Sequence, residues 1–249
     1  MKRAVILLMC MSLLGFGASF TFEAQTPTPT VNDILTKYVA ALGGRGAISK
    51  LTSRVSKGTL QVVGVEEWGT AESYAKAPNK YCSIITFPGG GEVRRGFDGH
   101  TAWLRRPDTG VSDLTGQDLS SMQRSSNFYQ SIELDKLYPK LTLKGQETVA
   151  AYPTYVLEGD PGDGSLRRMY FDISSGLMIR TDEEMNAQTD NGITRITSQT
   201  FLEDYREVEG VKQPFSIRQI NGALTVIIHL TEVRVNQPVD DALFAKPAK

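Results

Sequence analysis

Cysteine and histidine are scarce in this chain of 249 residues, with two of each. If the N-terminal segment that carries Cys10 is removed, Cys82 has no partner for an intramolecular disulfide. No H-x-x-x-H, C-x-x-C or EF-hand pattern occurs, and the acidic stretch DPGDG (160–164) is typical of a tight turn. The sequence therefore predicts no metal site and no cofactor, and its stability has to come from an apolar core.

A strong charge of either sign is also missing. The formal net charge is -1, and the basic residues form no dense cluster. This composition argues against nucleic acid as a main partner. Beyond the N-terminal region no apolar run approaches the length of a membrane span. The remainder of the chain is therefore expected to contain no transmembrane segment.

Motifs for catalysis are absent as well. Neither His100 nor His229 is accompanied by a G-x-S-x-G nucleophile motif. The glycine-rich stretch PGGGE (88–92) lacks the Lys and Ser/Thr that complete a phosphate-binding loop. Adjacent acids at 66–67 and 182–184 would point to opposite faces of a strand, so we expect them at solvated edges. We predict that the protein is not an enzyme.

The N-terminus has the pattern of a secretory signal peptide. Lys2 and Arg3 precede an apolar run over residues 4–20, and small residues that suit cleavage occur near its end at 17–19 and after it at 24. We assign residues 1–25 to the signal peptide, 26–30 (TPTPT) to a short tether, and 31–249 to a single domain. An uncleaved anchor is the alternative. The expected location is the periplasm or another exported site in the cell envelope.

The rest of the chain is predicted to be mainly β. Residues 31–42 carry apolar side chains at helical spacing, and Gly43 supplies the stop. From Val55 onward, about 11 strand-like segments alternate with turn sequences, which indicates antiparallel pairing of neighbours along the chain. Residues 116–139 interrupt this series and are predicted to form one or two short helices.

Such a series of hairpins predicts one wide antiparallel sheet that curls into an unclosed barrel. Its concave face is apolar and needs a cover. The helix over residues 31–42 is about 18 Å long, too short to cover the sheet alone. Residues 116–139 or a ligand must complete the cover, and spacing alone leaves a dry core and a ligand cavity both open.

Alternation along the strands selects the candidate ligand-binding residues of this cavity. The wall candidates are Phe87, Leu157, Met169, Phe171, Phe215, Ile217 and Ile228. Met122 and Phe128, in the helical interruption, are predicted to belong to a movable lid, since Met adapts to varied apolar partners. Trp103 has two interpretations that stay open, a residue at the cavity mouth or a residue of the packed core.

Paired arginines recur within predicted strands, at 94–95, 105–106 and 167–168. Each pair places one guanidinium on either face of the sheet. One interpretation is contact with anionic headgroups or the polar part of a lipoprotein at the cavity rim. The other is solubility of the convex face and protection of the sheet edge.

Four phrases carry a resemblance to a known family: GFDGHTAW (96–103), YVLEGDPGDGSLRRMYFDISSGLMIRTDEE (155–184), DYREVEGVKQPFSI (204–217) and VNQPVDDALFAKP (235–247). With the order of the predicted elements, the chain resembles the LolA/LolB-like superfamily of periplasmic lipoprotein carriers, including proteins labelled outer membrane lipoprotein-sorting proteins. The resemblance implies an unclosed barrel around an apolar cavity, a helical lid, lipoprotein acyl chains as cargo, and donor and acceptor proteins at the two membranes.

The leading hypothesis is therefore a carrier that buries acyl chains or another hydrophobic ligand without chemistry. A non-catalytic envelope sensor or protein-interaction module on the same fold is the alternative. A carrier predicts a continuous apolar cavity under a hinged cover, whereas an interaction module predicts a filled interior and an exposed patch.

Overall fold

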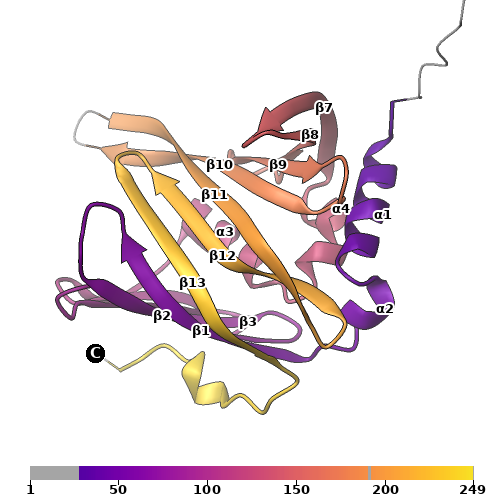
Figure 1. Ribbon diagram of the computed structural model, residues 1–249. Helices are drawn as coiled ribbons and strands as arrows, with labels where there is room; N and C mark the ends of the chain where they lie inside the picture. The colour runs from indigo at the N-terminus through magenta and orange to yellow at the C-terminus, as the bar shows by residue number, and fades with distance from the viewer. Residues whose placement is uncertain (1–27, 190–191, 249) are drawn as a thin grey trace, which may run out of the picture.

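The computed structural model describes residues 28–189 and 192–248. The predicted signal peptide (1–25) and the first part of the tether lie outside the described residues, so they stay predictions. The description begins just before the first helix, and the structure that follows is dominated by one sheet (Figure 1).

Thirteen antiparallel strands form this sheet, in the order β6-β5-β4-β3-β2-β1-β13-β12-β11-β10-β9-β8-β7. The strands are β1 (Ser53–Val62), β2 (Trp68–Lys76), β3 (Lys80–Thr86), β4 (Glu92–Phe97), β5 (Ala102–Arg106), β6 (Gly110–Asp113), β7 (Lys140–Val149), β8 (Tyr152–Asp160), β9 (Leu166–Asp172), β10 (Met178–Thr189), β11 (Gly192–Val208), β12 (Val211–Asn221) and β13 (Leu224–Val235). β6 and β7 are the two edges and do not pair with each other. The prediction of a curled, unclosed antiparallel sheet is confirmed, although the short β6 was not predicted.

Six short helices accompany the sheet in the described part of the chain: α1 (Val31–Ala41), α2 (Arg45–Ile48), α3 (Gly116–Ser126), η1 (Gln130–Ile132), α4 (Leu134–Leu137) and η2 (Asp241–Leu243). Thr30 begins α1 with a capping box, in which its side chain and that of Asp33 satisfy each other's backbone N–H. Gly43, with a φ of 117°, follows its end. The predicted N-terminal helix, its glycine stop and the short helices within 116–139 are confirmed.

The helix α1 packs against the part of the concave face that β8 and β9 form. It buries Ile34 and Tyr38, and the Tyr38 ring stands edge-on to Phe171 with centroids 5.2 Å apart. Leu157 and Met169 of β8 and β9 belong to the same buried cluster. Each such side chain stabilises the fold by about 1.5–3 kcal/mol when fully buried. This cluster is the main core, and it attaches the N-terminal helix to the last third of the sheet.

The helix α3 bridges the two ends of the sheet. On one side, Met122 packs with Phe97 and Ala102 of β4 and β5. On the other side, its polar residues reach the β8–β9 turn and β10, as Arg124 does with Asp163 at 2.6 Å. Figure 1 shows α3 behind β11 and β12, within the curve of the sheet. The helix thus spans the opening that the missing β6–β7 pairing leaves.

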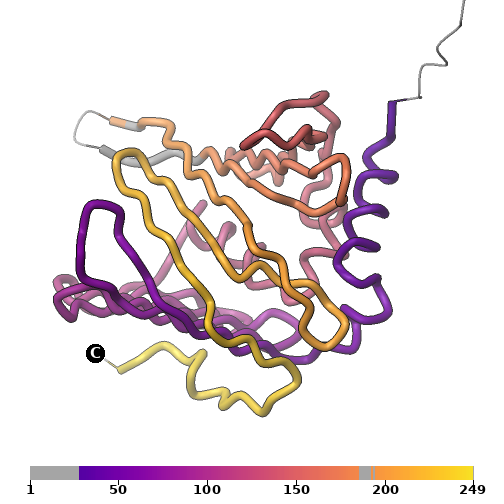
Figure 2. Tube along the Cα trace, in the orientation of Figure 1, coloured from indigo at the N-terminus to yellow at the C-terminus, as the bar shows by residue number. Residues whose placement is uncertain are grey.

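The C-terminal segment lies on the outer face of the first strands. In Figure 2 the yellow tube after β13 runs below the strands β1 to β3, outside the curve. Phe244 and Trp103 are fully buried there, and Trp103 Nε1 donates a hydrogen bond to the Phe244 carbonyl at 2.8 Å. The Trp103 ring lies over Gly96, where an added Cβ would come within 2.5 Å of a ring carbon. Only glycine allows this approach.

Candidate functional site

A continuous apolar band crosses the inner, helix-bearing face of the sheet. The register places Leu60 of β1 beside Ile228 of β13, Ile228 beside Ile217 of β12, and Ile217 beside Leu202 of β11. Leu60 is buried and the other three are partly buried. Four adjacent strands therefore present branched apolar side chains side by side in one row.

The band extends into a cluster that contains no helical residue. Its members come from strands β1, β2, β3 and β13 and from the residue after β3: Leu60, Val62, Ala71, Ile85, Phe87, Val226 and Ile228. Val62, Ile85, Phe87 and Ile228 keep part of their surface accessible. The two helices that cover other parts of this face pack in separate clusters. This end of the inner wall is therefore apolar and incompletely covered.

Two depressions flank α1. One, of about 250 Å³, lies between its N-terminal half and the ends of β8 and β9, with Lys37, Tyr155 and Phe171 in its lining. The other, of about 330 Å³, lies between α1 and the η1–α4 region, with Val39 and Leu134 in its lining. Because space remains on both sides of the helix, α1 is a narrow cover whose sides are not sealed by neighbouring elements.

The C-terminal end of α1 is the better anchored one. The Leu42 carbonyl accepts a hydrogen bond from Lys212 N at 2.8 Å, and Arg45 donates to the Ile132 carbonyl at 3.0 Å. An added Cβ at Gly43 would lie 2.0 Å from the Gly210 carbonyl oxygen, so the two backbones are in close contact. Near the middle of the helix, Lys37 Nζ donates a hydrogen bond to the Ile173 carbonyl. This asymmetry favours movement of α1 about its glycine end.

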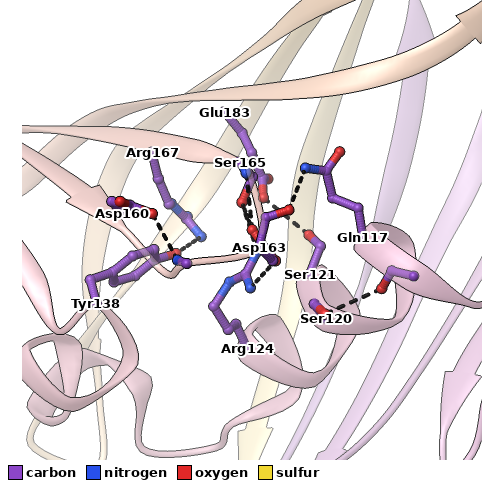
Figure 3. Close-up of polar contacts among 12 residues, drawn as sticks. Gln117, Ser120, Ser121, Arg124, Tyr138, Asp160, Asp163, Ser165, Arg167 and Glu183 are labelled. Carbon is purple, nitrogen blue, oxygen red and sulfur yellow. Dashed lines mark hydrogen bonds and ion pairs between the residues drawn. The ribbon is translucent and has the colours of Figure 1, made fainter. Parts of the chain in front are cut away.

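Beneath α1 the inner face changes from apolar to polar. Arg167 of β9 donates from Nη1 to the Tyr138 hydroxyl at 3.3 Å, and its Nε is buried without a hydrogen-bond partner (Figure 3). Arg54 of β1 donates from Nη1 to Gln213 Oε1 at 3.0 Å. Burial raises the pKa of Tyr38 to about 12, and the positive charges of Arg167 and Arg54 act in the opposite direction. The Tyr38 phenol therefore lies within electrostatic range of both guanidinium groups.

A second polar group attaches α3 to the sheet (Figure 3). Besides its ion pair with Asp163, Arg124 donates to Ser165 Oγ at 3.1 Å, and Ser121 donates to Glu183 Oε1 at 3.0 Å. Burial raises the pKa of Asp163, but hydrogen bonds from Ser165 and Arg124 outweigh it and hold that pKa below its ordinary value. These contacts attach α3 to β10 and to the β8–β9 turn through polar side chains.

The structure brings most of the predicted wall residues to the inner face, in two groups. Leu157, Met169 and Phe171 are buried in the core beneath α1. Phe87, Ile217 and Ile228 belong to the incompletely covered wall. Met122, a residue of α3, is buried against β4 and β5, and Phe128 is partly buried with its ring edge-on to Tyr129 at 5.2 Å.

Two predicted residues belong to neither group. Trp103 packs beneath the C-terminal segment on the outer face, so core packing is the interpretation that the structure shows. Phe215 is buried beneath the guanidinium of the exposed Arg206, whose central carbon is 4.7 Å from the ring centroid. Strand alternation alone did not predict which residues cover Trp103 and Phe215.

Sequence reasoning missed Arg54, Leu60 and Leu202 as inner-face residues. Arg54 and Leu60 are six positions apart in one strand, and this even spacing assigns them to one face. The spacing was visible in the sequence, but the burial of the face was not. The paired arginines were interpreted correctly in one respect: Arg167 points inward, while Arg168 pairs with Glu158 at 3.0 Å on the outer face.

The two histidines lie outside the inner wall. His100 is exposed in the β4–β5 turn, and His229 is exposed on β13, where its ring stacks on Trp68 with centroids 6.2 Å apart. Within residues 28–189 and 192–248, no group of three or more His, Cys, Asp or Glu side chains is placed to hold a metal ion. No helix in the described part of the chain is both long enough and apolar enough to cross a bilayer.

Comparisons with known proteins find similarity in structure. No protein-family model matches the sequence, and no curated protein matches it. A solved DUF1329 family protein from Desulfovibrio piger matches with a TM-score of 0.55 at 16% identity, over 88% of this chain and 98% of that chain. A LolA superfamily protein from Nitrosomonas europaea matches with a TM-score of 0.54 at 15% identity, over 88% of this chain and 99% of that chain.

A protein domain from Vibrio parahaemolyticus that is named for outer membrane lipoprotein sorting matches with a TM-score of 0.53 at 13% identity, over 84% of this chain and 97% of that chain. Together these likenesses show that the chain has a LolA-like fold. At such identities they concern the fold alone, so the function has to be argued from the site.

Proposed function

We propose that the protein is an exported carrier of the cell envelope that binds lipoprotein acyl chains or another hydrophobic ligand on the inner face of its sheet. Residues 31–249 act as one unit after removal of the signal peptide. The ligand is buried without chemistry and passes to a partner protein that offers a better apolar site. Donor and acceptor proteins at the two membranes are the partners that this role requires.

The observation that carries the proposal is the apolar band from Leu60 to Leu202, with its incompletely covered end at Phe87 and Ile228. Leaving apolar side chains accessible to water forgoes about 25 cal/mol for each Å² that a ligand would cover. An acyl chain on this wall recovers that free energy. No directional contact is needed, which suits a carrier of varied cargo.

We assign the moving cover to α1. The depressions on both sides of this helix and its attachment near Gly43 favour displacement of its N-terminal half. Met122 and Phe128, our sequence-based choices for a lid, lie in a region that the Arg124–Asp163 ion pair attaches to the sheet. In this proposal α3 bridges the barrel opening while α1 admits the ligand.

The test uses an uncharged fluorescent probe, the methyl ester of cis-parinaric acid. Ile228→Asn places an amide in the inner band, whereas Ile227→Asn makes the same change on the outer face, where Ile227 faces Arg218. We expect Ile228→Asn to weaken probe binding about tenfold, equivalent to about 1.4 kcal/mol. Ile227→Asn is expected to bind as wild type does.

Circular dichroism checks that both variants are folded. Binding on the inner band would be contradicted if the wild-type protein did not bind the ester, or if both variants lost the same amount of affinity for it.

A second candidate function is supported by a different surface. Val63, Val65 and Leu224 are 56%, 42% and 46% exposed, and they lie at the tips of the β1–β2 and β12–β13 hairpins. A hydrogen bond from Val63 N to the Thr225 carbonyl at 2.9 Å holds these tips together. Exposed apolar residues at one rim favour docking to another envelope protein, as the interaction-module hypothesis requires.

The variant Val65→Ser/Leu224→Ser separates the two functions. An interaction module loses its envelope partner, measured by cross-linking, and keeps the inner band unchanged. A carrier retains its affinity for the methyl ester in this variant, and it loses that affinity in Ile228→Asn.

A further inference from the structure

Two partly buried arginines on the inner face, Arg54 and Arg167, have no carboxylate partner among the described residues. Arg54 has one hydrogen bond, to the neutral Gln213, and Arg167 has one, to the neutral Tyr138 hydroxyl. Among the ion pairs of the described residues, neither guanidinium lies within 4.0 Å of an acid. Glu183 acts on Arg167 electrostatically, but its carboxylate accepts the Ser121 hydroxyl instead.

Arginines on the outer face are neutralised directly. Arg168, the neighbour of Arg167 in β9, has Nε 3.0 Å from Glu158 and Nη1 3.7 Å from Glu184. Arg180 of β10 pairs with Asp182 and also lies over the Tyr170 ring at 4.7 Å. The outer arginines Arg168 and Arg180 are therefore directly ion-paired, whereas Arg54 and Arg167 on the inner face are not.

Unneutralised arginines in a protected site are costly. Arg does not lose its proton in proteins, so burial cannot be relieved by deprotonation. Burial lowers the pKa of Arg54, which reflects this cost. Arg167 adds a buried Nε–H without an acceptor, and an unsatisfied buried donor of this kind destabilises the protein. A bound anion would satisfy both groups at once.

Arg54 also lies in line with the apolar band, on the same strand as Leu60. Arg54 and Leu60 share a face of β1, six residues apart, which is about 20 Å at about 3.3 Å per residue. The acyl region of one membrane leaflet is about 15 Å thick, half of the hydrocarbon core. One acyl tail therefore fits along the wall between the arginines and the incompletely covered end.

We propose that Arg54 and Arg167 bind the anionic head of an acyl ligand, a carboxylate or a phosphate, whose tail lies along the inner apolar band. The planar guanidinium forks suit either anion, since both accept paired N–H donors. Tyr38 of α1, within range of both charges, places this head beneath the moving cover. The inference rests on the proposed function, because it names the chemical class of ligand for the same inner face.

The test compares cis-parinaric acid with its methyl ester, which differ only in the head. Wild-type protein is expected to bind the acid at least tenfold more tightly than the ester. Arg54→Gln and Arg167→Gln are each expected to weaken binding of the acid about tenfold and to leave binding of the ester unchanged. Arg168→Gln, next to Arg167 but on the outer face, is the matched control and is expected to bind both probes as wild type does.

Competition distinguishes the sources of the head. Displacement of parinaric acid by palmitate assigns a carboxylate, and displacement by lysophosphatidate assigns a phosphate. If Arg54→Gln does not fold, Arg54→Lys replaces it, because lysine keeps the positive charge and removes the planar guanidinium fork. The proposal is overturned if the ratio of the affinities for acid and ester is the same as in wild type both in this variant and in Arg167→Gln. Equal wild-type affinities for acid and ester overturn the headgroup site and leave the carrier intact, whereas binding of neither probe overturns both.

Discussion

The contact between Trp103 and Phe244 allows a test of whether Trp103 stabilises the outer face of the sheet or contributes to the ligand site. Both residues are fully buried, and the indole Nε1–H donates to the Phe244 carbonyl at 2.8 Å. Trp103→Phe keeps an aromatic ring in place and removes the donor. The Phe244 carbonyl is then buried without a partner, since the C-terminal segment still covers it.

The expected loss follows from that orphaned acceptor. Leaving one buried polar group unsatisfied costs about 1–3 kcal/mol. For a domain of this size each kcal/mol lowers Tm by about 2–4 °C, so Trp103→Phe should lower Tm by about 2–12 °C. Differential scanning calorimetry measures the shift. Binding of the uncharged acyl ester should stay at the wild-type level, because the indole is on the outer face.

Trp68→Phe is the control for this experiment. Trp68 is 51% exposed and only stacks on His229, so its loss is expected to stay within about 0.5 kcal/mol. Equal Tm shifts for the two variants would refute the energetic reasoning. Loss of ester binding in folded Trp103→Phe would refute the placement of Trp103 outside the ligand site.

Two further predictions concern the helices over the inner face. The pKa of Asp163 in the folded protein is held below its ordinary value. Its ion pair with Arg124 therefore contributes its full stability above the pKa of an unfolded aspartate, about 3.9. This contribution is lost as the pH falls through the lower pKa of the folded state. Asp163→Asn should therefore reduce stability at pH 7 and flatten its fall below about pH 4, measured by urea unfolding; an unchanged pH profile would contradict this. For α1, an added Cβ at Gly176 would lie 2.8 Å from Lys37 Cγ, so the two positions are close in space. The double variant Lys37→Cys/Gly176→Cys should therefore form a disulfide between α1 and the β9–β10 turn. The disulfide should slow uptake of the acyl ester at least tenfold, and reductant should restore the wild-type rate. Equally fast uptake by the oxidised protein would show that α1 does not move.

Local features were predictable because they depend on residues close in the sequence. The apolar spacing over residues 31–42, the glycine at 43 and the hairpin turns each specify a conformation within a few residues. Inward and outward residues of β9 were separated correctly by alternation alone, as Met169 and Arg168 show. The short β6 was missed because four residues, GVSD, carry too little alternation to be recognised.

The environment of each face depended on contacts far apart in the chain. Trp103 and Phe244 are 141 residues apart, and nothing near Trp103 in the sequence indicates that a C-terminal segment covers it. Leu60 meets Ile228 only because β1 pairs with β13. Alternation divides side chains into two sets, but which set faces helices, solvent or a ligand is decided by packing between distant elements.

The sequence by itself determined a curled hairpin sheet, its N-terminal helix and the short helices between its two halves, since period, turn chemistry and caps are local properties. The tertiary structure alone decided that α3 bridges the unclosed ends, that Trp103 lies outside, and that Arg54 and Arg167 share the space beneath Tyr38. β1 and β9 lie five positions apart in the sheet order, so it is the curvature of the sheet that brings both arginines within electrostatic range of Tyr38, and no sequence window contains this arrangement.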